Sequence, residues 1–240
     1  MPKLHINRYL QDVGQCAIAS SSTLGNFFNP DIDYNLCKKM IYKITKNPSD
    51  GLDSGEIGLF LNFLGFKSVN IISSDLHMFD YSWTKLKKEN LIETLKKASK
   101  KNKTAYKIAL KSIIKWIDSK EFNNKLVIDY KFGDYIKKEI DKGIPLIVTF
   151  NWTLFFKMTK MDPFSEEWEE HAVVAYGYDK KGVFICDSHH EHYKYKLKRF
   201  REGLYHMNWE TLMSVIGFGD VITVADYDYE IFKNNFEKIN

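Results

Sequence analysis

A cysteine near one end of the sequence and a histidine and an aspartate far along it constrain this chain more than any other feature. Cys16 begins an Ala- and Ser-rich segment, 16–28, whose composition is typical of a tightly packed helix. His171 begins one apolar run and Asp187 ends the next, with the turn 179–182 between them. Two such runs form a hairpin, which brings both residues to the same end of it. A thiol becomes a useful nucleophile when it lies beside a base, and the base works best when a third group fixes its tautomer. If the three residues act together, the fold must bring the start of the Cys16 helix to this hairpin.

Composition limits the class of protein. The 240 residues are 44% hydrophobic and 28% charged, as in a soluble globular protein, and suffice for one domain with a proper core. No run approaches the ~18 apolar residues of a membrane-spanning helix, and the first residues lack the apolar stretch of a secretion signal. Three cysteines are too few for a disulfide scaffold and favour a reducing compartment. We therefore expect a cytoplasmic protein; the net charge of +4 indicates no particular partner.

The first 75 residues are predicted to be mostly helical. Residues 33–46 carry apolar side chains at helical spacing, which predicts one helix there. Asp53 with Glu56 three residues later has the pattern of a capping box, and Gly65 is a helix stop. A short strand is expected over 69–72.

A lysine-rich zone, 76–124, follows. Two apolar stripes predict two amphipathic helices joined near residues 100–104. We interpret the lysines as the solvated faces of these helices. A membrane-surface or nucleic-acid patch is the alternative, but no aromatic residues interleave the basic run.

From residue 125 onward, strands dominate. Strands are expected at 126–129, 145–150, 172–178, 182–186, 204–207 and 221–224, with helices at 135–141 and 209–216. Helices first and an antiparallel sheet later make an α+β layout.

These features resemble the papain-like cysteine peptidases, and among them the group that removes double-glycine leaders from bacteriocins. The resemblance rests on Gln11 ahead of the Cys16 helix, the run Gly143-Ile-Pro-Leu-Ile-Val148, the strand His171–Asp179, and Asp187 at the end of the next strand. It covers residues 5–75 and 130–225, and the histidine strand is its more specific part.

The resemblance implies a papain-like fold with a helical half led by the cysteine helix and a C-terminal antiparallel sheet. The chain would be a single catalytic domain, 1–240, with 76–124 inserted as a helical cap. Carried over residue by residue, Cys16 would be the nucleophile, His171 the general base and then acid, and Asp187 its orienter. Gln11 would donate its side-chain amide to the oxyanion together with the Cys16 backbone N–H. A helix N-terminus and a neighbouring imidazolium both favour the thiolate.

Two departures from the family pattern concern the nucleophile's surroundings. Gln11 precedes Cys16 by five residues, one fewer than expected of papain-like enzymes, so Gln15 or Asn7 could serve instead. Ala17 stands where a glycine commonly follows the nucleophile. The other cysteines, Cys37 and Cys186, lie in apolar patterns and are expected in the core.

Two segments remain open to more than one interpretation. The stretch between Phe150 and His171 is expected to be a long loop, with exposed aromatic residues followed by acidic ones: Asp162, Glu166, Glu167, Glu169 and Glu170. It could be a lid that favours cationic substrates, or a solvated turn. The histidines 189, 190 and 192 could bind zinc, but no second ligand cluster is evident, so no metal or other cofactor is expected.

Three hypotheses for function follow. The first is a cysteine hydrolase acting on a peptide or isopeptide bond of a peptide or protein substrate. The second keeps the nucleophile but transfers the acyl group to an amine or thiol, which exclusion of water would favour. The third is a binding module of the same fold without turnover. The sequence names neither the substrate nor the oligomeric state.

Overall fold

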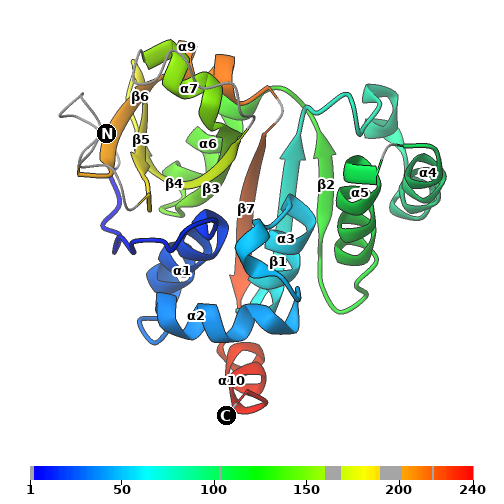
Figure 1. Cartoon of the computed structure of the whole chain (residues 1–240), viewed down its shortest axis with the longest axis horizontal. Coiled ribbons are helices and arrows are strands. Elements are labelled where there is room, and N and C mark those ends of the chain that lie inside the picture. Colours follow the sequence, from blue (N-terminus) through cyan, green and yellow to red (C-terminus); the bar gives the residue numbers. More distant parts are fainter. Residues whose placement is uncertain (1–2, 103, 160–168, 190–201, 218, 240) are drawn as a thin grey trace.

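One mixed sheet, with helices on both faces, organises the molecule (Figure 1). The structure is a computed structural model that describes residues 3–102, 104–159, 169–189, 202–217 and 219–239. Its strands are β1 Phe66–Ser73, β2 Lys125–Ile128, β3 Leu146–Asn151, β4 Glu170–Tyr178, β5 Gly182–Cys186, β6 Leu204–Asn208 and β7 Asp220–Tyr227. Its α-helices are α1 Cys16–Phe28, α2 Tyr34–Met40, α3 Ser54–Phe63, α4 Lys88–Lys101, α5 Thr104–Ile117, α6 Phe132–Asp141, α7 Trp152–Thr159, α9 Trp209–Val215 and α10 Tyr229–Glu237.

The strand order is β2-β1-β7-β3-β4-β5-β6. Strands β1 and β2 are parallel, and every other pair of neighbours is antiparallel. Strand β7 lies between β1 and β3, and so joins the strand that follows the N-terminal helices to the strands of the C-terminal half. The predicted α+β layout, with the cysteine in the first helix, is confirmed.

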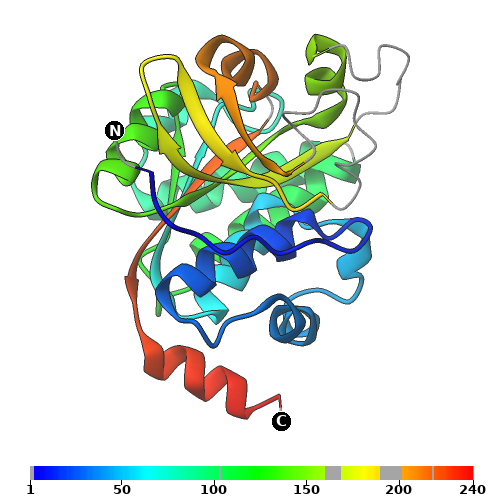
Figure 2. The same ribbon diagram turned by 90° about the vertical axis from the view of Figure 1, so that its left-hand side faces the viewer.

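Two hydrophobic clusters lie on opposite faces of the sheet, and β4 contributes to both. Ala172 and Val174 pack into the cluster formed with α1, α2, α3 and α5, whereas Val173 and Ala175 pack into the cluster formed with α6, α7 and α9. This alternation is the two-residue period of a strand buried on both sides. Figure 2 shows α1, in dark blue, running below the yellow strands β4 and β5. The cysteine helix therefore packs against the strand that carries His171.

The predicted capping box at the start of α3 is present. The Asp53 side chain accepts a hydrogen bond from the Glu56 N–H, and the Glu56 side chain accepts one from the Asp53 N–H. Helix α2 is shorter than predicted, because after Met40 the chain tightens into a 3₁₀ turn, Ile41–Lys43.

The lysine-rich zone contains the two predicted helices, α4 and α5. Helix α5 packs closely on α3 at Gly55, where an added Cβ would collide with the backbone of Ser112 and Ile113. Leu95 of α4 and Leu110 of α5 are fully buried in the same hydrophobic cluster as α1. In the described residues, no helix combines the length and apolar character that crossing a lipid bilayer requires.

The expectation of a long loop between Phe150 and His171 is wrong for its first half. Residues Trp152–Thr159 form α7, which starts where the Asn151 side chain accepts a hydrogen bond from the Leu154 N–H at 2.6 Å. Trp152 and Phe155 are buried against Phe150, so tertiary packing uses the aromatic residues that showed no helical period in the sequence. The acidic residues Asp162, Glu166 and Glu167 lie outside the described residues.

Candidate active site

Cys16 is the first residue of α1, at the positive end of the helix dipole. The loop that leads to it turns at Gly14, whose φ of +73° lies in the left-handed region. A Cβ at Gly14 would also collide with the carbonyl group of Ser49. The approach to Cys16 therefore requires glycine at this point.

Helix α1 is fixed to β4 one turn beyond Cys16. The Ser20 hydroxyl, which is buried, donates a 2.9 Å hydrogen bond to the Ala172 carbonyl. The Ala172 N–H in turn helps to lower the pKa of the Cys16 thiol. These contacts hold the sulfur beside the residue that precedes Ala172 in the strand, His171.

His171 and Asp187 meet at the end of the β4–β5 hairpin, as predicted. His171 Nε2 lies 2.7 Å from Asp187 Oδ1, and the two side chains are only 4% and 0% exposed. Because a carboxylate oxygen accepts hydrogen bonds, Nε2 carries a proton and donates it to Asp187. The other ring nitrogen, Nδ1, is then available to interact with Cys16. The His171 ring also shares two cavities with Cys16, and each of the two groups shifts the pKa of the other.

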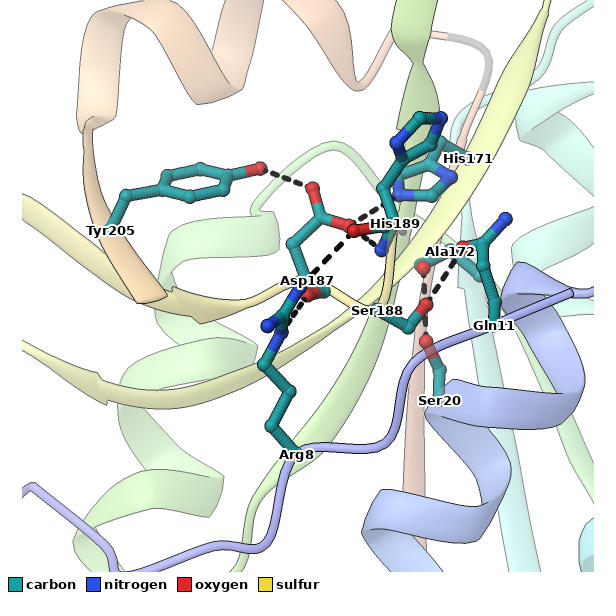
Figure 3. A network of polar contacts seen from close by, with 9 residues as sticks. All are labelled: Arg8, Gln11, Ser20, His171, Ala172, Asp187, Ser188, His189 and Tyr205. Carbon is teal, nitrogen blue, oxygen red and sulfur yellow. Dashed lines mark hydrogen bonds and ion pairs between the residues drawn. The ribbon is translucent and has the colours of Figure 1, made fainter. Parts of the chain in front are cut away.

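Asp187 is held by more than its bond to His171 (Figure 3). The Tyr205 hydroxyl donates to Oδ2 at 2.9 Å, and the His189 N–H donates to Oδ1 at 2.9 Å. Both oxygens of this buried carboxylate are therefore bound, which fixes its orientation toward the imidazole. Tyr205 was not identified from the sequence; the only available signal is its place in β6, the strand next to β5.

The electrostatics favour an ion pair between the thiol and the imidazole. Burial raises the pKa of the Cys16 thiol, but the hydrogen bond and charge of His171 outweigh it, and the pKa falls below its ordinary value. Burial lowers the pKa of His171, but the charge and hydrogen bond of Asp187 outweigh it, and the pKa rises above its ordinary value. Each shift favours the charged form, so the site stabilises the thiolate–imidazolium pair relative to the neutral pair.

Trp152 covers the imidazole. Its ring centroid is 4.1 Å from that of His171, and the indole, 3% exposed, also stacks on Phe155 at 5.6 Å. Excluding water from the imidazole and carboxylate strengthens their interaction, because charges attract more strongly at low dielectric. Sequence reasoning missed this contact because it assigned Trp152 to an exposed loop.

Gln11 is close to the thiol. It lines a cavity of ≈ 530 Å³ together with Cys16, Trp152 and His171, and is 7% exposed. The two alternatives, Gln15 and Asn7, do not line either cavity that contains Cys16. Gln15 Oε1 accepts from the Tyr34 hydroxyl, and Asn7 Nδ2 donates to Asn26 Oδ1. The five-residue spacing therefore still brings the Gln11 side chain to the cleft.

A second cavity, of ≈ 650 Å³, also contains Cys16 and His171. Ala17 and two residues of α5, Ile108 and Ala109, contribute to its wall, as do four acidic residues: Asp50, Asp53, Glu56 and Glu170. Burial raises the pKa of Asp53 to about 6. The cleft thus extends to both sides of the thiol, and α5 of the lysine-rich zone borders one side.

The other two cysteines lie in the core, as predicted. Cys37 is fully buried and Cys186 is 3% exposed. Burial raises the pKa of each thiol to about 12, so neither forms a thiolate near neutral pH. Cys16 is the cysteine whose pKa is lowered instead.

Only one of the three histidines considered as zinc ligands, His189, lies within the described residues. Across the described residues, no three His, Cys, Asp or Glu side chains are gathered as a metal site requires. His189 lies at the cleft, with its ring centroid 5.4 Å from that of Trp152, whereas His190 and His192 lie outside the described residues.

Comparison with known proteins gives one match. The model of the family described as Peptidase_C39 like family matches residues 3–215, which is most of the chain. The matched range contains Gln11, Cys16, His171 and Asp187. Searches of curated proteins and of solved structures found no match.

Proposed function

The chain belongs to the Peptidase_C39 like family, and on that premise we propose that it is a cysteine hydrolase that cleaves a peptide or isopeptide bond. Cys16 is the nucleophile, His171 the general base and acid, and Asp187 the residue that orients the imidazole. The observation that carries the proposal is the single His171 ring, which lines the same cavity as the Cys16 thiol and lies 2.7 Å from a buried carboxylate. A family match alone would also suit a protein without turnover.

The first half of the reaction forms an acyl-enzyme. The Cys16 thiolate attacks the carbonyl carbon, and the carbonyl oxygen takes up the negative charge. The Gln11 side-chain N–H and the Cys16 backbone N–H donate to this oxygen; one such donor is typically worth about 3 kcal/mol in the transition state. The C–N bond then breaks, and the imidazolium of His171 gives its proton to the leaving amine.

The second half returns the enzyme to its starting state. A water molecule loses a proton to neutral His171 and attacks the thioester carbon. The C–S bond breaks, the acid product leaves, and the thiolate and imidazolium are restored. Asp187 stays ionised throughout and keeps the imidazole in the required tautomer.

We further propose that α4 and α5 act as a cap on a single catalytic domain. Ile108 and Ala109 line the cavity that contains Cys16, so a substrate bound there would contact α5. The cap would influence which peptide is admitted without supplying a reacting group.

Labelling and product analysis test the proposal. Iodoacetamide or a peptide vinyl sulfone should modify Cys16, and Cys16→Ala should abolish the modification. Incubation with a peptide library, followed by mass spectrometry, should give cleaved products that carry a free carboxylate. Products joined to an added amine would instead indicate acyl transfer, and a labelled protein that releases no product would indicate a binding module.

A further inference from the structure

The residue that follows Asp187 in the chain is tied twice to Gln11 (Figure 3). The Ser188 carbonyl accepts a hydrogen bond from the Gln11 backbone N–H at 2.9 Å. The Ser188 hydroxyl donates to Gln11 Oε1 at 2.8 Å. Both side chains are buried, at 4% and 7% exposed. Two segments separated by most of the sequence are therefore joined at the cleft through one serine.

The side-chain bond determines which end of the Gln11 amide faces the cleft. A carboxamide has an acceptor oxygen on one side and a donor NH₂ on the other. With Oε1 bound to Ser188, the nitrogen is on the side away from Ser188, as Figure 3 shows. If the amide were reversed, its oxygen would face the developing oxyanion, and the interaction would change from stabilising to repulsive.

The bond also fixes a flexible side chain before substrate binds. Ordering a glutamine side chain costs rotamer entropy. When Ser188 orders Gln11 in the folded protein, this cost is not added to the transition state.

The Ser188 backbone is held independently of its hydroxyl. Arg8 Nε donates to the Asp187 carbonyl at 2.6 Å, and Arg8 Nη2 donates to the His189 carbonyl at 3.1 Å. The Asp187 N–H donates to the Gly203 carbonyl at 2.7 Å. Removing the hydroxyl should therefore release the Gln11 amide while leaving the turn after Asp187 in place.

We propose that Ser188 is a positioning residue for the oxyanion: its hydroxyl holds Oε1 of Gln11 so that the amide nitrogen is presented to the reacting carbonyl oxygen. The inference rests on the proposed function, because it assumes that Cys16 attacks a carbonyl carbon. Ser188 acts only through Gln11 and leaves the thiolate–imidazolium pair unchanged.

Two small reagents separate these effects without knowledge of the natural substrate. Acylation of Cys16 by p-nitrophenyl acetate passes through an oxyanion, whereas alkylation by iodoacetamide is a displacement at carbon that forms none. Ser188→Ala should slow acylation by on the order of 10-fold to 100-fold, below the full loss of one oxyanion donor. Its alkylation rate, and the pH profile of that rate, should match the wild type. Ser188→Thr keeps a hydroxyl and should restore acylation.

The matched control is Ser214→Ala, which removes a hydroxyl that donates to a carbonyl within α9. It should leave both rates unchanged. In the double variant Gln11→Ala/Ser188→Ala, acylation should be no slower than in Gln11→Ala alone, because the serine has no effect without the amide.

Three results would overturn the inference. The first is an acylation rate in Ser188→Ala equal to that of the wild type, and the second is an equal decrease of its acylation and alkylation rates. The third is a double variant whose acylation rate is lowered by the product of the two single-variant factors. Failure of the proposed function looks different. In that case wild-type Cys16 would be alkylated but not acylated, or Cys16→Ala would react with the ester as fast as the wild type.

Discussion

Tyr205 donates its hydroxyl to Oδ2 of Asp187 at 2.9 Å, on the side of the carboxylate away from His171. The two residues come from neighbouring strands, β5 with its following turn and β6, and both are buried. The hydroxyl thus satisfies a carboxylate oxygen that water does not reach.

Tyr205→Phe should therefore destabilise the protein, because a buried carboxylate oxygen loses a hydrogen-bond donor. We expect a decrease of about 1–3 kcal/mol in the free energy of unfolding, measured by urea denaturation. Activity should also fall, since Asp187 is less firmly oriented. The control is Tyr178→Phe, whose hydroxyl donates to Asp141 at the surface and should matter little. Equal stability of the two variants would contradict this account.

Replacing the proposed nucleophile should remove thiol reactivity and keep the fold. Cys16→Ala should lower turnover at least about 1,000-fold and abolish iodoacetamide labelling, because the buried Cys37 and Cys186 have pKa values raised to about 12. Labelling followed by peptide mapping measures this. If Cys186 in this variant were modified as fast as the wild-type protein is labelled, Cys16 would not be the reactive thiol. His171→Ala also removes the base, but it empties a buried site under Trp152, so its unfolding must be measured alongside.

The pH dependence should follow the ion pair. The pKa of Cys16 is lowered, so with increasing pH the alkylation rate should rise earlier than for an ordinary thiol, which titrates at about 8.5. The pKa of His171 is raised, so this residue should lose its proton at a pH above the ordinary value of about 6.5. Peptide cleavage should decline over the same pH range.

Asp187→Asn separates the contributions to this profile. Without the carboxylate the pKa of His171 should fall, and the alkaline limb of kcat/KM should move to lower pH. The imidazolium then stabilises the thiolate over a smaller range of pH. A profile identical to the wild type would show that Asp187 does not stabilise the charge on His171.

The cap is best tested by a point substitution. Deleting α4 and α5 would expose the face of α3 around Gly55, so loss of function in that variant would be ambiguous. Ile108 is 61% exposed and lines the cavity that contains Cys16. Ile108→Ala should raise KM for a cleaved peptide and leave iodoacetamide alkylation unchanged. Lys107→Ala, at the neighbouring exposed position, is the control; equal effects on KM would argue against contact between α5 and substrate.

Much of the fold could be predicted because its signals are local. The turn 179–182 and the apolar runs around it predict the β4–β5 hairpin, and this brings His171 to Asp187. The Asp53–Glu56 pair likewise predicts the start of α3.

The residues that were missed act through contacts between distant segments. Trp152 is helical because its ring packs on Phe155 and His171, not because the segment has a regular apolar period. Ser188 and Tyr205 have ordinary polar side chains whose roles depend on which strand lies beside them. No local pattern records such pairings, and only the assembled sheet reveals them.

The central position of β7 has a consequence for how the protein assembles. Strands β1 and β3 are not neighbours, and residues 220–227 fill the space between them. Until these residues have left the ribosome, β1 and β2 cannot be joined to β3–β6. Joining the two sets of strands forms contacts between segments far apart in the sequence, and such contacts form slowly. The sheet is therefore completed late in synthesis, after most of the chain has been made.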